Sequence, residues 1–150
     1  MSTTRLAING FGRIGRNAFK IAFERADLEI VAINDLTDNK TLAYLLKHDS
    51  NYGTYGHEVI ANEEGFTVDG KQVKVLAEKD PAALPWGDMA IDVVIESTGF
   101  FTDKDGASKH IQAGAKRVVI SGPTKSEGVD TIVLGANDDK VENATEVVSN

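Results

Sequence analysis

Three glycines near the amino terminus constrain the fold more than any other feature of this chain. Gly10, Gly12 and Gly15 follow the spacing Gly-x-Gly-x-x-Gly, directly after the apolar run 5–9. A second apolar run covers residues 29–34, and between the runs apolar side chains recur at helical spacing: Ile14, Ala18, Ile21 and Ala22. This order predicts a strand, a tight turn, an amphipathic helix and a second, buried strand.

The same arrangement is the fingerprint of a dinucleotide-binding βαβ unit. Gly10 would permit the tight turn, Gly12 would let the backbone approach a pyrophosphate, and Gly15 would let the helix pack closely on the strand. The start of the helix would offer unpaired N–H groups and a positive dipole end to the phosphates. A glycine-rich turn that binds nothing is the alternative, and the flanking strand and helix patterns argue against it.

An acidic residue stands where this motif requires one. Asp35 ends the second predicted strand, 20 positions after Gly15. Its carboxylate can accept hydrogen bonds from both adenosine ribose hydroxyls and would repel the 2′-phosphate of NADP, which favours NAD. The alternative is that Asp35 only caps the following turn. Arg13 lies beside the pyrophosphate by position, although a solvated arginine at a helix start has the same spacing.

Small polar residues follow two later strands. Ser97-Thr98-Gly99 comes after the predicted strand 92–96, and Ser121-Gly122 comes at the end of the predicted strand 117–121. Ligands of open parallel sheets bind outside the carboxyl ends of the strands, so these residues are candidates for contact with the cofactor. Ordinary turns are the alternative in both places.

The remaining pattern predicts one α/β domain over residues 1–150, a Rossmann-type fold with a mainly parallel sheet and flanking helices. Residues 51–76 are predicted to form an antiparallel insertion with strands at 58–60, 65–68 and 71–76, a hairpin turn at Asp69-Gly70, and a last strand that rejoins the main sheet. The other expected elements are helices at 41–48 and 107–113, the latter ended by Gly114, and strands at 131–134 and 146–149. No helix follows the last strand, so we expect the sheet to be left incompletely covered there.

Composition excludes several classes of function. The net charge is −7, which argues against duplex nucleic acid or an anionic membrane as the main partner. No secretory signal or membrane-length apolar run is present, which predicts a soluble cytoplasmic protein. The chain has no cysteine, so it has no disulfide, no thiolate metal site and no cysteine nucleophile. Its histidines lack metal-ligand spacing, so we expect no metal site. Trp86 is expected to pack in the core, and His110 is expected to be a surface or packing histidine.

Longer strings extend the dinucleotide motif to a family. The chain resembles the phosphorylating, glycolytic glyceraldehyde-3-phosphate dehydrogenases over almost its whole length and in family order. The matching strings are INGFGRIGR at 8–16, AINDL at 32–36, DSNYG at 49–53, EKDP at 78–81, ESTGFFT at 96–102, GAKRVVIS at 114–121 and the closing SN at 149–150.

This resemblance implies roles for individual positions. Arg13 and Ile14 would contact the pyrophosphate and Asp35 would hold the adenosine ribose. Lys79 would lie at the adenine end, Thr98 would flank the cofactor, and Ser121 would lie near the nicotinamide. The family implied is a cytosolic homotetramer that oxidises glyceraldehyde 3-phosphate with NAD and phosphate to 1,3-bisphosphoglycerate in glycolysis, through a cysteine thioester.

The resemblance also implies what this chain lacks. The family's catalytic cysteine, general-base histidine and catalytic domain follow the SN string and are absent here, so we assign no catalytic residue and expect the chain alone to be inactive. An isolated NAD-binding half, as a domain, a proteolytic piece or a truncated form, is one interpretation. A non-catalytic dinucleotide-binding module is another, and a structural fragment that self-associates through an uncovered apolar face is a third. The same domain of an erythrose-4-phosphate dehydrogenase also remains open.

Overall fold

The structure, a computed structural model, describes residues 3–150. In chain order the elements, with η marking a 3₁₀ helix, are β1 (Thr4–Asn9), α1 (Arg13–Phe23), β2 (Leu28–Asn34), α2 (Asn39–Lys47), β3 (His48–Asp49), β4 (Gly53–Thr54), β5 (Val59–Asn62), β6 (Gly65–Val68), β7 (Lys71–Leu76), η1 (Pro81–Ala83), β8 (Val93–Glu96), α3 (Lys104–Gln112), β9 (Arg117–Ile120), β10 (Asp130–Thr131), η2 (Asp138–Asn143) and β11 (Val147–Ser149). The predicted alternation of strands and helices is confirmed.

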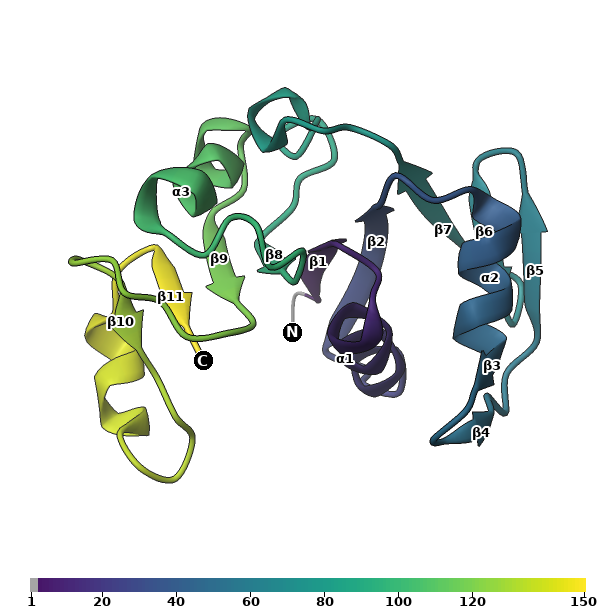
Figure 1. The fold of residues 1–150 in the computed structure, drawn as a ribbon, viewed down its shortest axis with the longest axis horizontal. Coiled ribbons are helices and arrows are strands. Elements are labelled where there is room, and N and C mark those ends of the chain that lie inside the picture. The colour runs from purple at the N-terminus through teal and green to yellow at the C-terminus, as the bar shows by residue number, and fades with distance from the viewer. Residues whose placement is uncertain (1–2) are drawn as a thin grey trace.

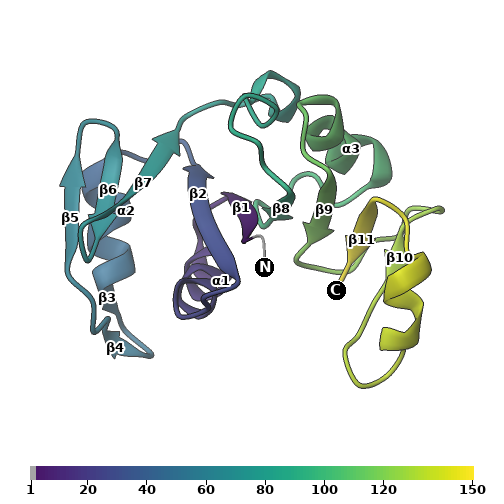
Figure 2. The ribbon, with the colours of Figure 1, turned by 180° about the vertical axis from the view of Figure 1, so that it is seen from behind.

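The main sheet has nine strands in the order β10-β11-β9-β8-β1-β2-β7-β6-β5. Every neighbouring pair from β10 to β7 is parallel, and only the pairs β7-β6 and β6-β5 are antiparallel. β1 therefore lies inside the sheet, with β5 and α2 toward one end of the molecule and β10 with η2 toward the other (Figures 1 and 2). The mainly parallel Rossmann-type fold is confirmed.

The central strands are apolar because both of their faces are covered. Ala7 and Ile8 on β1, like Ala32 and Ile33 on β2, are fully buried and point to opposite faces of the sheet. One face carries a core that includes phenylalanines from α1 and β6, and the other carries a core around Trp86. The expectation that Trp86 packs is confirmed.

Helix α1 is rotated relative to the stripe that the sequence suggested. Its buried residues are Gly15, Phe19 and Ala22, whereas Ile14 is 55% exposed and Ile21 is 68% exposed. The physical reason is the close approach at Gly15, which must face the sheet and thereby turns the positions four and seven residues later inward. The predicted helix is correct and Ala22 of its predicted apolar stripe is buried, but Ile14 and Ile21 of that stripe are exposed.

The insertion folds as predicted. β5, β6 and β7 pair antiparallel, and β7 then pairs in parallel with β2. The turn between β6 and β7 has positive φ at Asp69 (49°) and Gly70 (77°), as a two-residue hairpin of this type requires. A small separate sheet, β3-β4, precedes it and was not predicted.

His57 ties this insertion to the end of α1. Its Nδ1 lies 2.6 Å from Asp69 Oδ2 and its Nε2 lies 2.5 Å from Glu24 Oε1. The hydrogen bond to Asp69, followed by the one to Glu24, raises the pKa of His57 above its ordinary value of 6.5. Both carboxylates favour the charged imidazole, which joins the hairpin turn to the end of the helix.

Several predicted boundaries are wrong, two of them because side-chain hydrogen bonds to the backbone set the observed limits. α3 begins at Lys104 because Asp103 accepts a hydrogen bond from the Gly106 amide, so the predicted start at 107 is too late. The predicted strand 131–134 ends at Thr131, since the Asn137 side chain bonds the backbone of residues 131 and 133 and turns the chain. The helix predicted at 41–48 ends at Lys47 as α2. His48, which was predicted to be helical, has an extended backbone and begins β3.

Candidate cofactor-binding site

The carboxyl ends of β1, β2, β7 and β8 meet at one groove of about 370 Å³. In the sheet, β2 lies beside β1 on one side and β8 lies beside it on the other, so the direction of strand order reverses at β1. Open α/β sheets bind their ligands at such a switch point. The residues that line the groove are Asn9, Gly10, Gly12, Asn34, Asp35, Leu36, Glu78, Lys79, Ser97, Thr98, Phe100 and Phe101.

Each fingerprint glycine meets a different constraint. Gly10 has a φ of +89°, and a Cβ there would lie 2.7 Å from the Thr98 backbone nitrogen. A Cβ at Gly15 would lie 2.1 Å from the Gly10 carbonyl oxygen, whereas a Cβ at Gly12 would have no atom within 4 Å. Gly10 and Gly15 therefore serve the fold, and Gly12 leaves space open over the groove.

Phe11, the variable residue between the first two glycines, anchors the turn. Its side chain is 1% exposed and packs edge-on against Phe19 at a centroid distance of 5.7 Å. Its amide donates to Asp35 Oδ2 at 2.8 Å, and its carbonyl accepts from Arg16 Nη1 at 3.0 Å. This role of Phe11 was not predicted, because the glycine motif leaves the residue at that position unspecified.

Asp35 lines the groove and also stabilises the local backbone. Besides the Phe11 amide, it accepts a hydrogen bond from the Thr37 amide at 2.9 Å through Oδ1. The turn-capping alternative is thus real, but it does not exclude ligand binding. Each carboxylate oxygen has a second lone pair, so Asp35 can still accept two hydroxyl donors.

The start of α1 can bind an anion. Arg16 is the first residue whose amide bonds four residues back, to the Gly12 carbonyl at 3.0 Å. No side chain caps this helix and its first turn contains no acidic residue. The amides of Arg13 and Ile14 therefore stand at an uncapped, positive helix end beside the groove.

Of the site residues predicted beyond Asp35, two line the groove and one does not. Lys79 is exposed and lines the groove after β7, and Thr98 lines it after β8. Ser121 follows β9, where its amide donates to the Glu96 carbonyl at 3.0 Å, and it does not line this groove. Near Lys79, the pKa of Asp80 lies below its usual value because the Ala82 amide and then Lys109 hydrogen-bond to its carboxylate.

Apolar and polar lining residues beyond the predicted set complete the groove. Leu36 is 60% exposed and Phe100 is 83% exposed, so both offer apolar surface to a ligand. Asn9 and Asn34 close the floor from the ends of β1 and β2. Sequence reasoning could have found them from their position at strand ends, but an asparagine there has no defined partner until the fold is known.

Comparison with known proteins identifies the family. The family model described as glyceraldehyde 3-phosphate dehydrogenase, NAD binding domain, matches residues 4–104. The chain belongs to the glyceraldehyde-3-phosphate dehydrogenase family. NAD is accordingly its cofactor, and the free helix end, the open position at Gly12 and the strand-end carboxylate of Asp35 fit that dinucleotide.

Curated relatives agree over nearly the whole chain. Glyceraldehyde-3-phosphate dehydrogenase 1 of Bacillus cereus is 53% identical over 148 residues, which is 98% of this chain and 44% of the relative. The enzymes of Borreliella burgdorferi and Streptomyces coelicolor are each 55% identical and match 97% and 99% of this chain. The chain spans 44% of the length of these relatives too.

Two further features bear on partners. Within residues 3–150, no helix combines the length and apolar character needed to cross a membrane. Over the same range, no group of three or more histidine, aspartate and glutamate side chains is arranged to hold a metal ion.

Proposed function

We propose that residues 1–150 form the NAD-binding domain of a phosphorylating glyceraldehyde-3-phosphate dehydrogenase. The whole protein would oxidise glyceraldehyde 3-phosphate with NAD and phosphate to 1,3-bisphosphoglycerate, as a cytoplasmic homotetramer in glycolysis. The single observation that carries the proposal is the convergence of four strand ends and an uncapped helix start on one groove.

The polar groups of the groove suggest how the cofactor is held. The uncapped amides of Arg13 and Ile14 would bind the pyrophosphate, with the open position at Gly12 admitting it. Asp35 would accept the adenosine ribose hydroxyls through its remaining lone pairs. Its negative charge would also disfavour the 2′-phosphate of NADP.

The two ends of the cofactor would meet different surroundings. Lys79 and the apolar surfaces of Leu36 and Phe100 would lie toward the adenine. Thr98 would flank the cofactor, and Ser121 would face the nicotinamide from beyond β9. When bound, NAD supplies a hydride acceptor for the oxidation of an aldehyde.

The chemical half of the reaction needs groups outside this chain. A covalent thioester requires a thiolate, and the sequence contains no cysteine. We therefore expect the 150-residue chain to bind NAD without oxidising the aldehyde. We expect its affinity to be lower than that of a whole subunit, since 56% of the length of the relatives is not represented here.

Calorimetric titration of the chain with NAD and NADP tests the proposal. Saturable heat with NAD and a weaker response with NADP are expected. No heat at millimolar NAD, from a chain that is folded by circular dichroism, would reject autonomous binding. Reduction of NAD in the presence of glyceraldehyde 3-phosphate and phosphate would contradict the expected lack of activity.

A further inference from the structure

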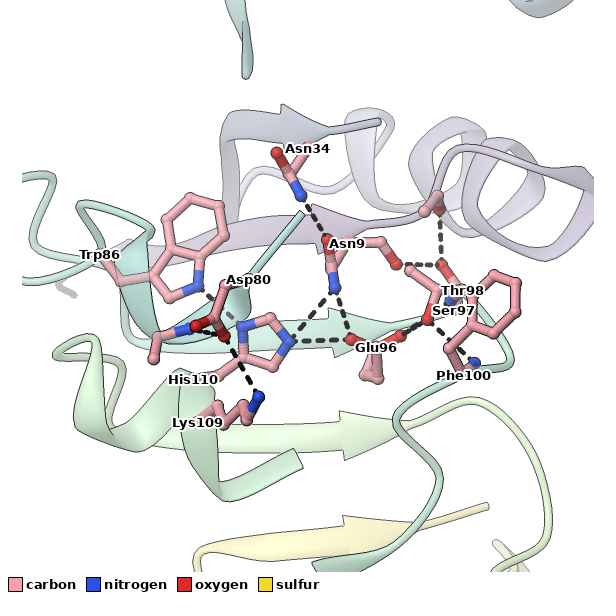
Figure 3. A network of polar contacts seen from close by, with 12 residues as sticks. Asn9, Asn34, Asp80, Trp86, Glu96, Ser97, Thr98, Phe100, Lys109 and His110 are labelled. Carbon is pink, nitrogen blue, oxygen red and sulfur yellow. Dashed lines mark hydrogen bonds and ion pairs between the residues drawn. The ribbon is translucent and has the colours of Figure 1, made fainter. Parts of the chain in front are cut away.

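A chain of polar side chains that includes two residues of the groove, Asn9 and Asn34, continues through Glu96 and His110 to Trp86 (Figure 3). Asn9 and Glu96 are each 1% exposed, and His110 is fully buried. Among residues 3–150, none of their hydrogen-bond partners is a lysine or arginine. The buried groups must therefore satisfy one another through hydrogen bonds alone.

Trp86 sets the direction of hydrogen bonding at one end of this chain. Its indole Nε1 donates to His110 Nδ1 at 2.9 Å. An indole nitrogen can only donate, so Nδ1 must carry a lone pair and the ring proton must sit on Nε2. His110 consequently donates from Nε2 to Glu96 Oε2, which lies 2.8 Å away.

The backbone of Glu78 sets the direction at the other end. Its amide donates to Asn34 Oδ1 at 2.8 Å, so the amide group of Asn34 must face the other way. Asn34 Nδ2 then donates to the Glu78 carbonyl at 2.9 Å and to Asn9 Oδ1 at 2.7 Å. Asn9 is thereby oriented so that its Nδ2 donates to Glu96 Oε2 at 2.6 Å.

Both directions converge on one carboxylate. Glu96 Oε2 accepts hydrogen bonds from His110 Nε2 and Asn9 Nδ2. These two nitrogens lie 3.4 Å apart because both donate to the same oxygen. Glu96 Oε1 accepts from the Thr98 amide at 2.8 Å and from the Thr98 hydroxyl. All four bonds require an acceptor at position 96, and the two oxygens of the glutamate side chain provide it.

We propose that Glu96 and Asn34 are positioning residues for the cofactor groove. Glu96 holds Thr98 on the β8 side, and Asn34 holds Glu78, next to Lys79, on the β7 side. We call the segment at Thr98 and the segment at Glu78 and Lys79 the two walls of the groove. The strand order β8-β1-β2-β7 puts these walls at opposite sides of the groove. One buried hydrogen-bond chain thus sets the separation of the walls. This inference rests on the proposed function, because the groove is the proposed NAD site.

Glu96→Gln tests the convergence with almost no change of shape. Thr98, Asn9 and His110 all donate hydrogen bonds to Glu96. The glutamine NH₂ group also donates, so it would face donors on whichever side it lies. The variant must therefore give up the bonds with Thr98 or those with Asn9 and His110. In ¹⁵N spectra of the unliganded chain, we expect the single tryptophan indole signal and the amide signals of Thr98 and Glu78 to shift. We expect NAD affinity to fall about tenfold.

Glu29→Gln is the matched control, because it alters a half-exposed carboxylate on β2 whose partner is Arg5. It should leave those signals and the NAD affinity as they are in the unaltered chain. If Glu96→Gln also leaves the Thr98 and Glu78 amides unshifted, the proposal is wrong.

Asn34→Ala provides a second variant in case Glu96→Gln does not fold. Hydrogen exchange at the Glu78 amide should quicken, and NAD affinity should fall severalfold. Its control is Asn39→Ala, since Asn39 likewise binds loop carbonyls, at residues 62 and 63, away from the groove. Equal NAD affinity in the two variants would overturn the positioning role.

The two proposals can fail separately. Absence of NAD binding by the unaltered chain would reject the proposed function. The amide shifts and exchange rates are measured without NAD, so they still decide whether Glu96 and Asn34 hold the two walls.

Discussion

Two glycine-to-alanine substitutions in the same turn should separate folding from cofactor binding. Gly15→Ala places a methyl group 2.1 Å from the Gly10 carbonyl oxygen, whereas Gly12→Ala places one where no atom lies within 4 Å. Gly12 has a φ of −76°, which alanine also adopts. The first variant should therefore lose stability, and the second should lose NAD.

The cost of Gly15→Ala follows from this contact. A Cβ needs at least 3.0 Å, so backbone atoms must move by about 1 Å. The Gly10 carbonyl cannot move freely, because it accepts a hydrogen bond from Ser97 Oγ at 2.7 Å. Overpacking costs about 1–3 kcal/mol, and the helix propensity of alanine offsets up to about 1 kcal/mol. A net loss of about 2 kcal/mol lowers the Tm by about 4–8 °C.

The effect of Gly12→Ala falls on the ligand. Gly12 is the N-cap of α1, where exchange of glycine for alanine costs under about 1 kcal/mol of folding stability. The new methyl group stands in the space proposed for the pyrophosphate. We expect NAD to bind at least about tenfold more weakly, which corresponds to about 1.4 kcal/mol of binding free energy.

Thermal unfolding by circular dichroism and NAD titration by calorimetry measure the two effects on the same samples. The reasoning is refuted if Gly15→Ala unfolds at the same temperature as the unaltered chain. It is equally refuted if Gly12→Ala, folded and stable, binds NAD with unchanged affinity.

Three further substitutions test single interactions. Asp35→Asn should weaken NAD and narrow its advantage over NADP, because the negative charge is removed; an unchanged ratio in calorimetry would count against the ribose role. His57→Gln should reduce the pH dependence of stability. Because the pKa of His57 is raised on folding, its contribution to stability is full below pH 6.5 and is lost as pH rises through the folded-state pKa. The urea unfolding midpoints of the variant and the unaltered chain should therefore converge at alkaline pH. Trp86→Phe should cost about 2 kcal/mol in urea unfolding, because His110 Nδ1 loses its buried donor; an unchanged midpoint would contradict that bond.

The parts of the site that were predicted depend on local chain geometry. Gly10, Gly12, Gly15 and Asp35 lie within one βαβ unit, where a strand, a turn and a helix fix their relative positions over few residues. The hairpin at Asp69-Gly70 was predictable for the same reason, since positive φ is a local requirement.

Other features needed contacts between distant residues. The rotation of α1 was mispredicted because the buried face depends on where Gly15 meets the sheet, not on the hydrophobic pattern of the helix alone. Phe11 and Phe66 are 55 positions apart and stack at 5.9 Å in the core, which no local pattern indicates. The side-chain cap at Asp103 makes α3 begin at Lys104, three residues before the predicted start at 107.

The sequence by itself determined the dinucleotide fold, the preference expected for NAD, and the absence of a cysteine thiolate, because these depend on residue type and short spacing. Only the tertiary structure decided how the groove is held. Asn9 and Glu96 are 87 positions apart, and Glu96 and His110 come from a strand and a helix. Their donors and acceptors acquire a direction only when the parallel strands bring them within hydrogen-bond distance in a buried place.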